Sequence, residues 1–148
     1  MILETFTVQF KICSWTEVTY LHYFSRSICA RKFPDEVIMI LNKKLEDSTG
    51  FLHEGICIVI ELISEEFHYK MRDTIPLLID HFENRFGHSY QNLDSSATAL
   101  TRIFSDHPEL IPEDLEKILT IFMKYEKRNS VVFNTKILLD EIRKKGTT

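Results

Sequence analysis

The sequence predicts an all-α protein, built as a right-handed stack of antiparallel helical hairpins with about three to three and a half repeats. Two observations indicate this fold. The 148 residues include only 4 Gly and 4 Pro, which leaves few turns and favours long helices with short connections. An apolar helical pattern also recurs at intervals of about 40 residues, a period typical of proteins made of stacked two-helix units.

The recurrence is clearest in three stretches that begin near a proline or a capping residue. Pro34 and Pro112 open similar stretches that lie two repeat periods apart, and a third version begins between them at Asp73. The matching apolar positions follow the same period and are Val37/Ile75/Leu115, Ile40/Leu78/Ile118 and Leu41/Ile79/Leu119, with Phe82 and Phe122 one turn further on. The spacing predicts one helix of each repeating pair.

The helix described above is the second of each pair, and the first helix repeats in the same phase. Its matching positions recur with nearly the same period and are Leu21/Val59/Leu100/Leu139 and Phe24/Leu62/Ile103/Ile142. Helices of unrelated phase would seldom agree over three or four copies, so both helices belong to one repeat.

The individual helices follow from capping signals and apolar stripes. Residues 1–13 alternate as in a strand but also share a helical face, and we interpret them as helical. Ser14 and Glu17 form a capping box that begins a helix over 15–29. Proline is tolerated in a first turn and glycine ends helices. With these signals the remaining predicted helices are 34–46, 52–66, 74–86, 92–105, 112–127 and 130–145.

We call each set of apolar positions that match from repeat to repeat an apolar column. Over residues 15–145 the period and these apolar columns resemble those of the HEAT and armadillo classes of α-solenoid. The chain lacks the regular Asp and Arg at matched positions that many HEAT units carry. The resemblance implies a curved scaffold that binds other macromolecules, usually proteins, through its inner helical layer. We therefore expect a single helical-repeat domain over 1–148, in which residues 1–13 form a partial repeat or a capping segment, unless the chain is part of a longer protein.

Helical phase also predicts a partner surface. With Val37, Ile40 and Leu41 facing inward, Met39 and its counterparts in later repeats face outward, where apolar side chains are unexpected. The residues predicted to bind a protein partner are Met39, Leu77, His81, Asn84, Lys117, Ile121 and Lys124. The alternative is that the curved stack, or residues 1–13, buries these apolar side chains.

The sequence indicates no catalytic or metal centre. His53 and Cys57 are spaced i, i+4 and could place two ligands on one metal, but no second pair stands nearby, so we favour a buried cysteine and a histidine near a helix start. His81, His88 and His107 fall at helix ends or outward positions. Phosphate-binding loops and nucleophile motifs are absent from the sequence. We expect no enzyme activity and no cofactor.

Charge and cysteine content limit the class of partner and the cellular compartment expected for this chain. A net charge of −4 gives no general attraction for a nucleic acid backbone, and three scattered cysteines do not form a disulfide framework. A cytoplasmic or nuclear protein without a membrane span is expected. The sequence leaves three alternatives open. The chain is a nucleic-acid-binding helical repeat, or it self-associates through open solenoid ends. The third alternative is a closed Bcl-2-like bundle that binds a partner helix and has Ile56–Ile63 as its central helix.

Overall fold

The computed structural model describes residues 31–48, 50–83 and 89–146, and these residues are helical throughout except for short connections. The helices are α4 (Pro34–Asp47), α5 (Gly50–Phe67), α6 (Thr74–Glu83), α7 (Tyr90–Asp106), α8 (Leu115–Tyr125) and α9 (Asn129–Gly146), with 3-10 turns η1 (His68–Lys70) and η3 (Pro108–Leu110). The described ranges contain no strand. The prediction of an all-α fold is confirmed.

The predicted helix boundaries agree with the structure to within a few residues. The largest difference in the described part is at α8, which begins at Leu115 rather than at 112, because residues 113 and 114 form a turn. Ser89 caps α7 by accepting a hydrogen bond from the backbone N–H of Asn92, 3.3 Å away. The predicted helices over 1–13 and 15–29, and the last residues of the helix predicted over 74–86, lie outside the described residues.

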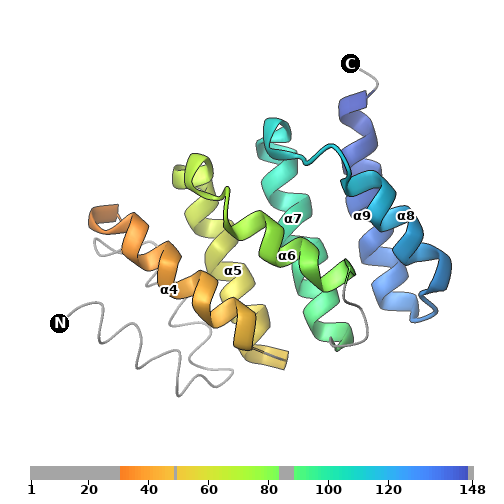
Figure 1. Cartoon of the computed structure of the whole chain (residues 1–148), viewed down its shortest axis with the longest axis horizontal. Coiled ribbons are helices and arrows are strands. Elements are labelled where there is room, and N and C mark those ends of the chain that lie inside the picture. Colours follow the sequence, from red (N-terminus) through yellow and green to blue (C-terminus); the bar gives the residue numbers. More distant parts are fainter. Residues whose placement is uncertain (1–30, 49, 84–88, 147–148) are drawn as a thin grey trace.

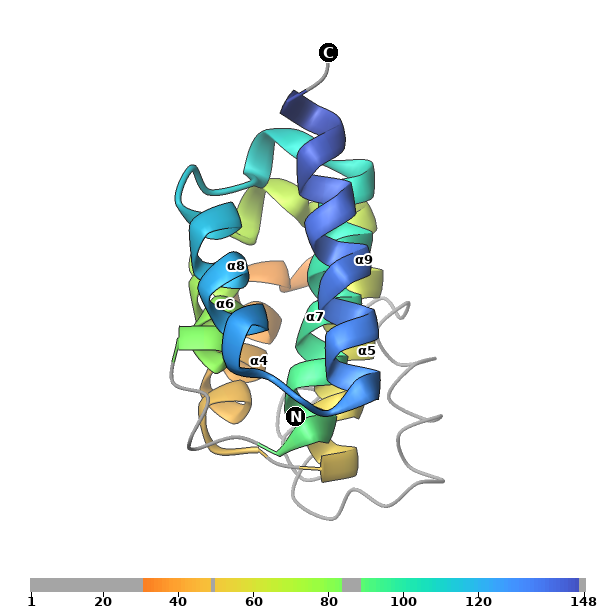
Figure 2. The same ribbon diagram turned by 90° about the vertical axis from the view of Figure 1, so that its right-hand side faces the viewer.

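The helices stand in two layers, which lie one behind the other in Figure 1 and side by side in Figure 2. The chain runs in one direction along α5, α7 and α9, and in the opposite direction along α4, α6 and α8. Within the first layer α7 packs between α5 and α9, and within the second α6 packs between α4 and α8. Each helix is therefore antiparallel to the next helix along the chain and parallel to the one after that.

Contacts between the layers pair the helices in a different way from the sequence prediction. The most extensive contacts across the layers join α4 to α5, α6 to α7 and α8 to α9. The order of the repeats in the sequence instead pairs α5 with α6, and α7 with α8. Those two connections each contain a 3-10 turn and lie at the opposite end of the layers from the loop between α8 and α9. In the structure, the second helix of each predicted pair therefore packs against the first helix of the next pair.

The core lies between the two layers and is built from the predicted columns. Val37, Ile75 and Leu115 are each at most 4% exposed, while Ile40 and Ile118 are partly buried against the core. The matching positions in the other layer are also inside, since Val59, Leu100 and Leu139 belong to the same core. None of the described helices is both long enough and apolar enough to cross a membrane.

Candidate functional site

The predicted partner residues that the structure describes do not share one environment. Met39 on α4 and Ile121 on α8 are 65% and 53% exposed, although both side chains are large and apolar. Lys117 and Lys124 are exposed on α8. Leu77 on α6 is partly buried and packs against the core. The exposed part of the predicted surface is therefore centred on α8.

His81 was wrongly predicted to face outward. Its side chain is 4% exposed, and its Nδ1 lies 2.6 Å from the hydroxyl of Ser96 on α7. The reason is the close packing of α6 on α7, which turns this position toward the core. Asn84, also predicted for the partner surface, lies outside the described residues.

His81 belongs to a buried polar network that joins four helices or their ends. Ser96 Oγ also lies 3.1 Å from His53 Nε2, and His53 Nδ1 lies 3.1 Å from the hydroxyl of Ser48. The two imidazoles meet edge to face with centroids 4.6 Å apart. Asn92 Nδ2 donates to the backbone carbonyl of Ser48 at 3.2 Å. Buried polar groups with such partners hold elements in place, and we assign His53 this structural role.

Cys57 is also part of the interior. Its side chain is 1% exposed. Burial, with a smaller contribution from the carboxylate of Glu61, raises the pKa of the thiol far above its ordinary value. The thiolate is the form that binds metal or attacks a substrate, so burial disfavours both roles for Cys57. The preferred sequence interpretation, a buried cysteine and a histidine near a helix start, agrees with the burial of Cys57 and with the place of His53 in the first turn of α5.

A hollow of about 440 Å³ lies on α8 beside the exposed apolar side chain of Ile121. Its described lining residues are Glu113, Glu116, Lys117, Thr120 and Ile121. Tyr125, four residues after Ile121, is 56% exposed, and the ammonium group of Lys124 lies 5.9 Å from the centre of its ring. The sequence prediction missed Tyr125, although the spacing of 117, 121 and 125 along one helix was a usable signal. This surface combines an apolar centre with both signs of charge.

A second groove, of about 410 Å³, lies between α5 and α7 in the other layer. Its lining includes the carboxyl groups of Glu54, Glu61 and Asp94, together with the ring of Tyr90. Burial raises the pKa of Glu61, although the nearby Arg102 partly offsets this. Carboxylates repel phosphate groups, so this face is unsuited to a nucleic acid backbone. The mixed surface on α8 is the better candidate for a binding site.

The helical pattern and these two surfaces are the basis on which a function has to be inferred. Comparisons with protein-family models, with curated proteins and with solved structures found no match for this chain.

Proposed function

We propose that the chain is a non-catalytic adaptor or scaffold in the cytoplasm or nucleus, which binds a protein partner through α8 and the exposed face beside it. In this proposal the two layers form a HEAT- or armadillo-like stack. The repeat of helix direction in each layer and the period of about 40 residues support that arrangement.

The observation that carries the proposal is the exposure of Ile121 beside the hollow on α8. More than half of this side chain is exposed, while Lys117 and Glu116 line the hollow with it. An apolar centre within a charged rim is the usual composition of a protein interface. The exposed ring of Tyr125 extends the same face by one helical turn, and tyrosine is among the residues enriched in binding hot spots.

The chemistry of the surface indicates the kind of partner. An apolar side chain of the partner would enter the hollow, and charged groups on either side of it would pair with Glu113 and Glu116 or with Lys117 and Lys124. An amphipathic helix presents apolar and charged residues at such spacings. We expect affinity to depend more on the apolar contact than on the charges, because exposed ion pairs contribute little.

Two single variants test the proposal. Ile121→Asp places a charge at the centre of the face, and Phe133→Asp is its matched control, because Phe133 is 64% exposed on α9 in the other layer. Proteins captured from lysate by the wild type and by each variant would be compared by quantitative mass spectrometry. Direct binding of the captured protein, once purified, would then be measured.

We expect Ile121→Asp to weaken direct binding by about tenfold or more, the effect of losing a hot-spot residue, while Phe133→Asp binds as the wild type does. Equal binding by all three proteins would refute the use of α8. A nucleic-acid-binding function predicts instead that binding to an oligonucleotide falls steeply with salt and is abolished by Lys117→Glu with Lys124→Glu.

A further inference from the structure

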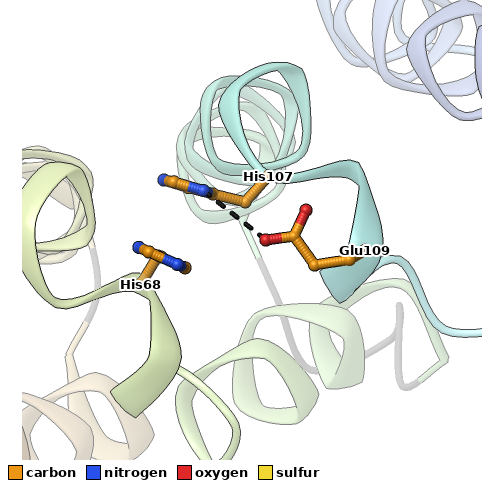
Figure 3. A group of neighbouring side chains, drawn as sticks. All are labelled: His68, His107 and Glu109. Atoms are coloured by element: carbon orange, nitrogen blue, oxygen red, sulfur yellow. Dashed lines mark ion pairs between the residues drawn. The ribbon is translucent and has the colours of Figure 1, made fainter.

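The two connectors at one end of the layers bring two histidines and a glutamate together (Figure 3). His68 begins η1 after α5, and His107 immediately precedes η3 after α7. Their imidazole rings are stacked with centroids 3.8 Å apart and planes inclined by 8°. Glu109 Oε1 lies 3.7 Å from His107 Nδ1, and one donor atom from each residue lies within 4.8 Å of the others.

One atom of this cluster lacks the partner that its burial requires. His68 Nδ1 is shielded from solvent and has no hydrogen-bond partner among the described residues. A buried nitrogen of this kind calls for an explanation, and an ion or a water molecule is the usual one. The neighbouring His107 is mostly buried as well, whereas the side chain of Glu109 is 60% exposed. The cluster is therefore enclosed on the histidine side and open to solvent on the glutamate side.

We propose that His68, His107 and Glu109 bind a divalent transition-metal ion, with zinc as the best match. Two imidazole nitrogens and one carboxylate oxygen form a known three-ligand set for zinc, in which water takes the fourth position. Imidazole also binds copper and nickel, but the hard cations magnesium and calcium prefer all-oxygen ligands. The open side at Glu109 provides both the path for the ion and the room for the water molecule.

Closing the site requires a small rearrangement of side chains. Zinc–nitrogen bonds are about 2.0–2.1 Å long, so the donors have to move closer than their present separation. The lone pairs of two parallel rings also do not converge on one point, so one imidazole has to turn about its Cβ–Cγ bond. This terminal torsion has a broad energy profile, and Glu109 is able to follow because it is exposed on a turn.

The bound ion would connect successive units of the fold. His68 belongs to the connection between α5 and α6, and the other two ligands belong to the connection between α7 and α8. The separation of His68 and His107 along the chain matches one repeat period. Because the ion binds the folded arrangement, zinc should raise the thermal stability of the chain.

The test is a calorimetric titration of the metal-free full-length chain with zinc chloride, alongside thermal melts with and without zinc. The wild type should bind one ion per chain at this site. Even the outer partners of metal ligands are worth roughly tenfold or more in affinity, so His107→Ala and Glu109→Gln should each weaken binding by at least that factor. Glu113→Gln removes a nearby exposed carboxylate outside the cluster and should bind zinc as the wild type does.

Glu109→Gln changes an exposed side chain, so it keeps the test valid if His107→Ala does not fold. Absence of zinc binding by the folded wild type would overturn the proposal. Equal binding by the wild type and Glu109→Gln, together with an equal rise in melting temperature, would also overturn it, since the ion would then be held by other histidines or cysteines of the chain.

Discussion

The rings of Phe82 and Phe122 meet edge to face, with centroids 5.2 Å apart and planes inclined at 85°. The two residues occupy matching positions of α6 and α8, one repeat period apart in the sequence. Both side chains are at most 3% exposed. The pair thus joins two neighbouring helices of one layer. The sequence predicted both residues as matching apolar positions, but not their contact.

Removing one ring of this pair should strongly destabilise the fold. Phe122→Ala loses both the burial of the ring and its contact with Phe82, and truncation of a buried phenylalanine costs about 3–5 kcal/mol. Urea denaturation followed by circular dichroism would measure the loss. Phe133→Ala, an exposed phenylalanine on α9, is the control and should change the free energy of unfolding by less than about 0.5 kcal/mol. Similar losses in the two variants would mean that the pair is not a core contact.

The apolar columns could be predicted because they depend on local helix geometry, which fixes which residues share a face. The burial of His81 could not be predicted, because it depends on the packing of α6 against α7, where Ser96 lies within hydrogen-bonding distance. Pairing of the helices into hairpins depends on the shape of the connections, which apolar periodicity does not encode. The stacking of His68 on His107 was not predicted, for a related reason. They lie in connectors without helical phase, and only their separation by one repeat period relates them.

Ser96 should matter more to stability than its small side chain suggests. Its hydroxyl lies within hydrogen-bonding distance of His53 and of His81. Ser96→Ala removes both hydrogen bonds at a fully buried position, and each is worth about 0.5–1.5 kcal/mol. We expect a loss of about 1–3 kcal/mol in the free energy of unfolding. Ser105→Ala, at an exposed position of the same helix, should have almost no effect. A loss confined to Ser105→Ala, or absent from both, would contradict the assigned role of the network.

Leu77 and Ile121 should respond differently to the same substitution. Leu77 packs against the core, whereas Ile121 is more than half exposed. Leu77→Asp introduces a charge beside apolar neighbours and should lower the free energy of unfolding by about 1–3 kcal/mol. Ile121→Asp should leave stability nearly unchanged and affect partner binding alone. Thermal melts of the two single variants would check this, and a large loss for Ile121→Asp would mean that its side chain is part of the core.

Glu126 should make the loop between α8 and α9 sensitive to acid. Its two carboxylate oxygens accept hydrogen bonds from Arg128 Nε and Nη2 at 2.9 and 3.0 Å, and Oε1 also accepts from the backbone N–H groups of Lys127 and Arg128. The hydrogen bond with the Arg128 side chain is the main reason that the pKa of Glu126 falls from 4.5 to about 2. The folded chain therefore holds this carboxylate ionised at pH values where the unfolded chain protonates it.

The stabilisation by Glu126 is accordingly complete above about pH 4.5 and is lost as the pH falls toward 2. Glu126→Gln should cost about 1 kcal/mol at neutral pH, since Arg128 is partly exposed and solvent screens the pair. Urea denaturation between pH 3 and 7 should show the wild type and the variant converging as the pH is lowered. A constant difference across this range would contradict the expectation. Glu113→Gln, on an exposed carboxylate, serves as the control.

Two positions that are buried on α7 carry basic residues on α9, the helix nearest the viewer in Figure 2. The alignment of Leu100 with Leu139 places Lys136 at the position of Ala97, and Arg143 at the position of Phe104. Ala97 and Phe104 are fully buried, whereas Lys136 is exposed and Arg143 pairs with Glu116 on α8 at 2.9 Å. These two basic residues keep part of the exposed face of α9 polar, while Phe133 and Ile137 on the same helix are 64% and 42% exposed.

Restoring the apolar residues of α7 should make this end associate. The double variant Lys136→Ala with Arg143→Phe exposes an apolar face on α9 and removes the ion pair to Glu116. Multi-angle light scattering across a range of concentrations should show a mass that rises with concentration for this variant and not for the wild type. Lys43→Ala with Lys124→Phe is the control, because it makes changes of the same kind at exposed lysines of the other layer. If the two double variants behaved alike, added apolar surface anywhere would explain the association, and Lys136 and Arg143 would have no special role in keeping α9 from associating.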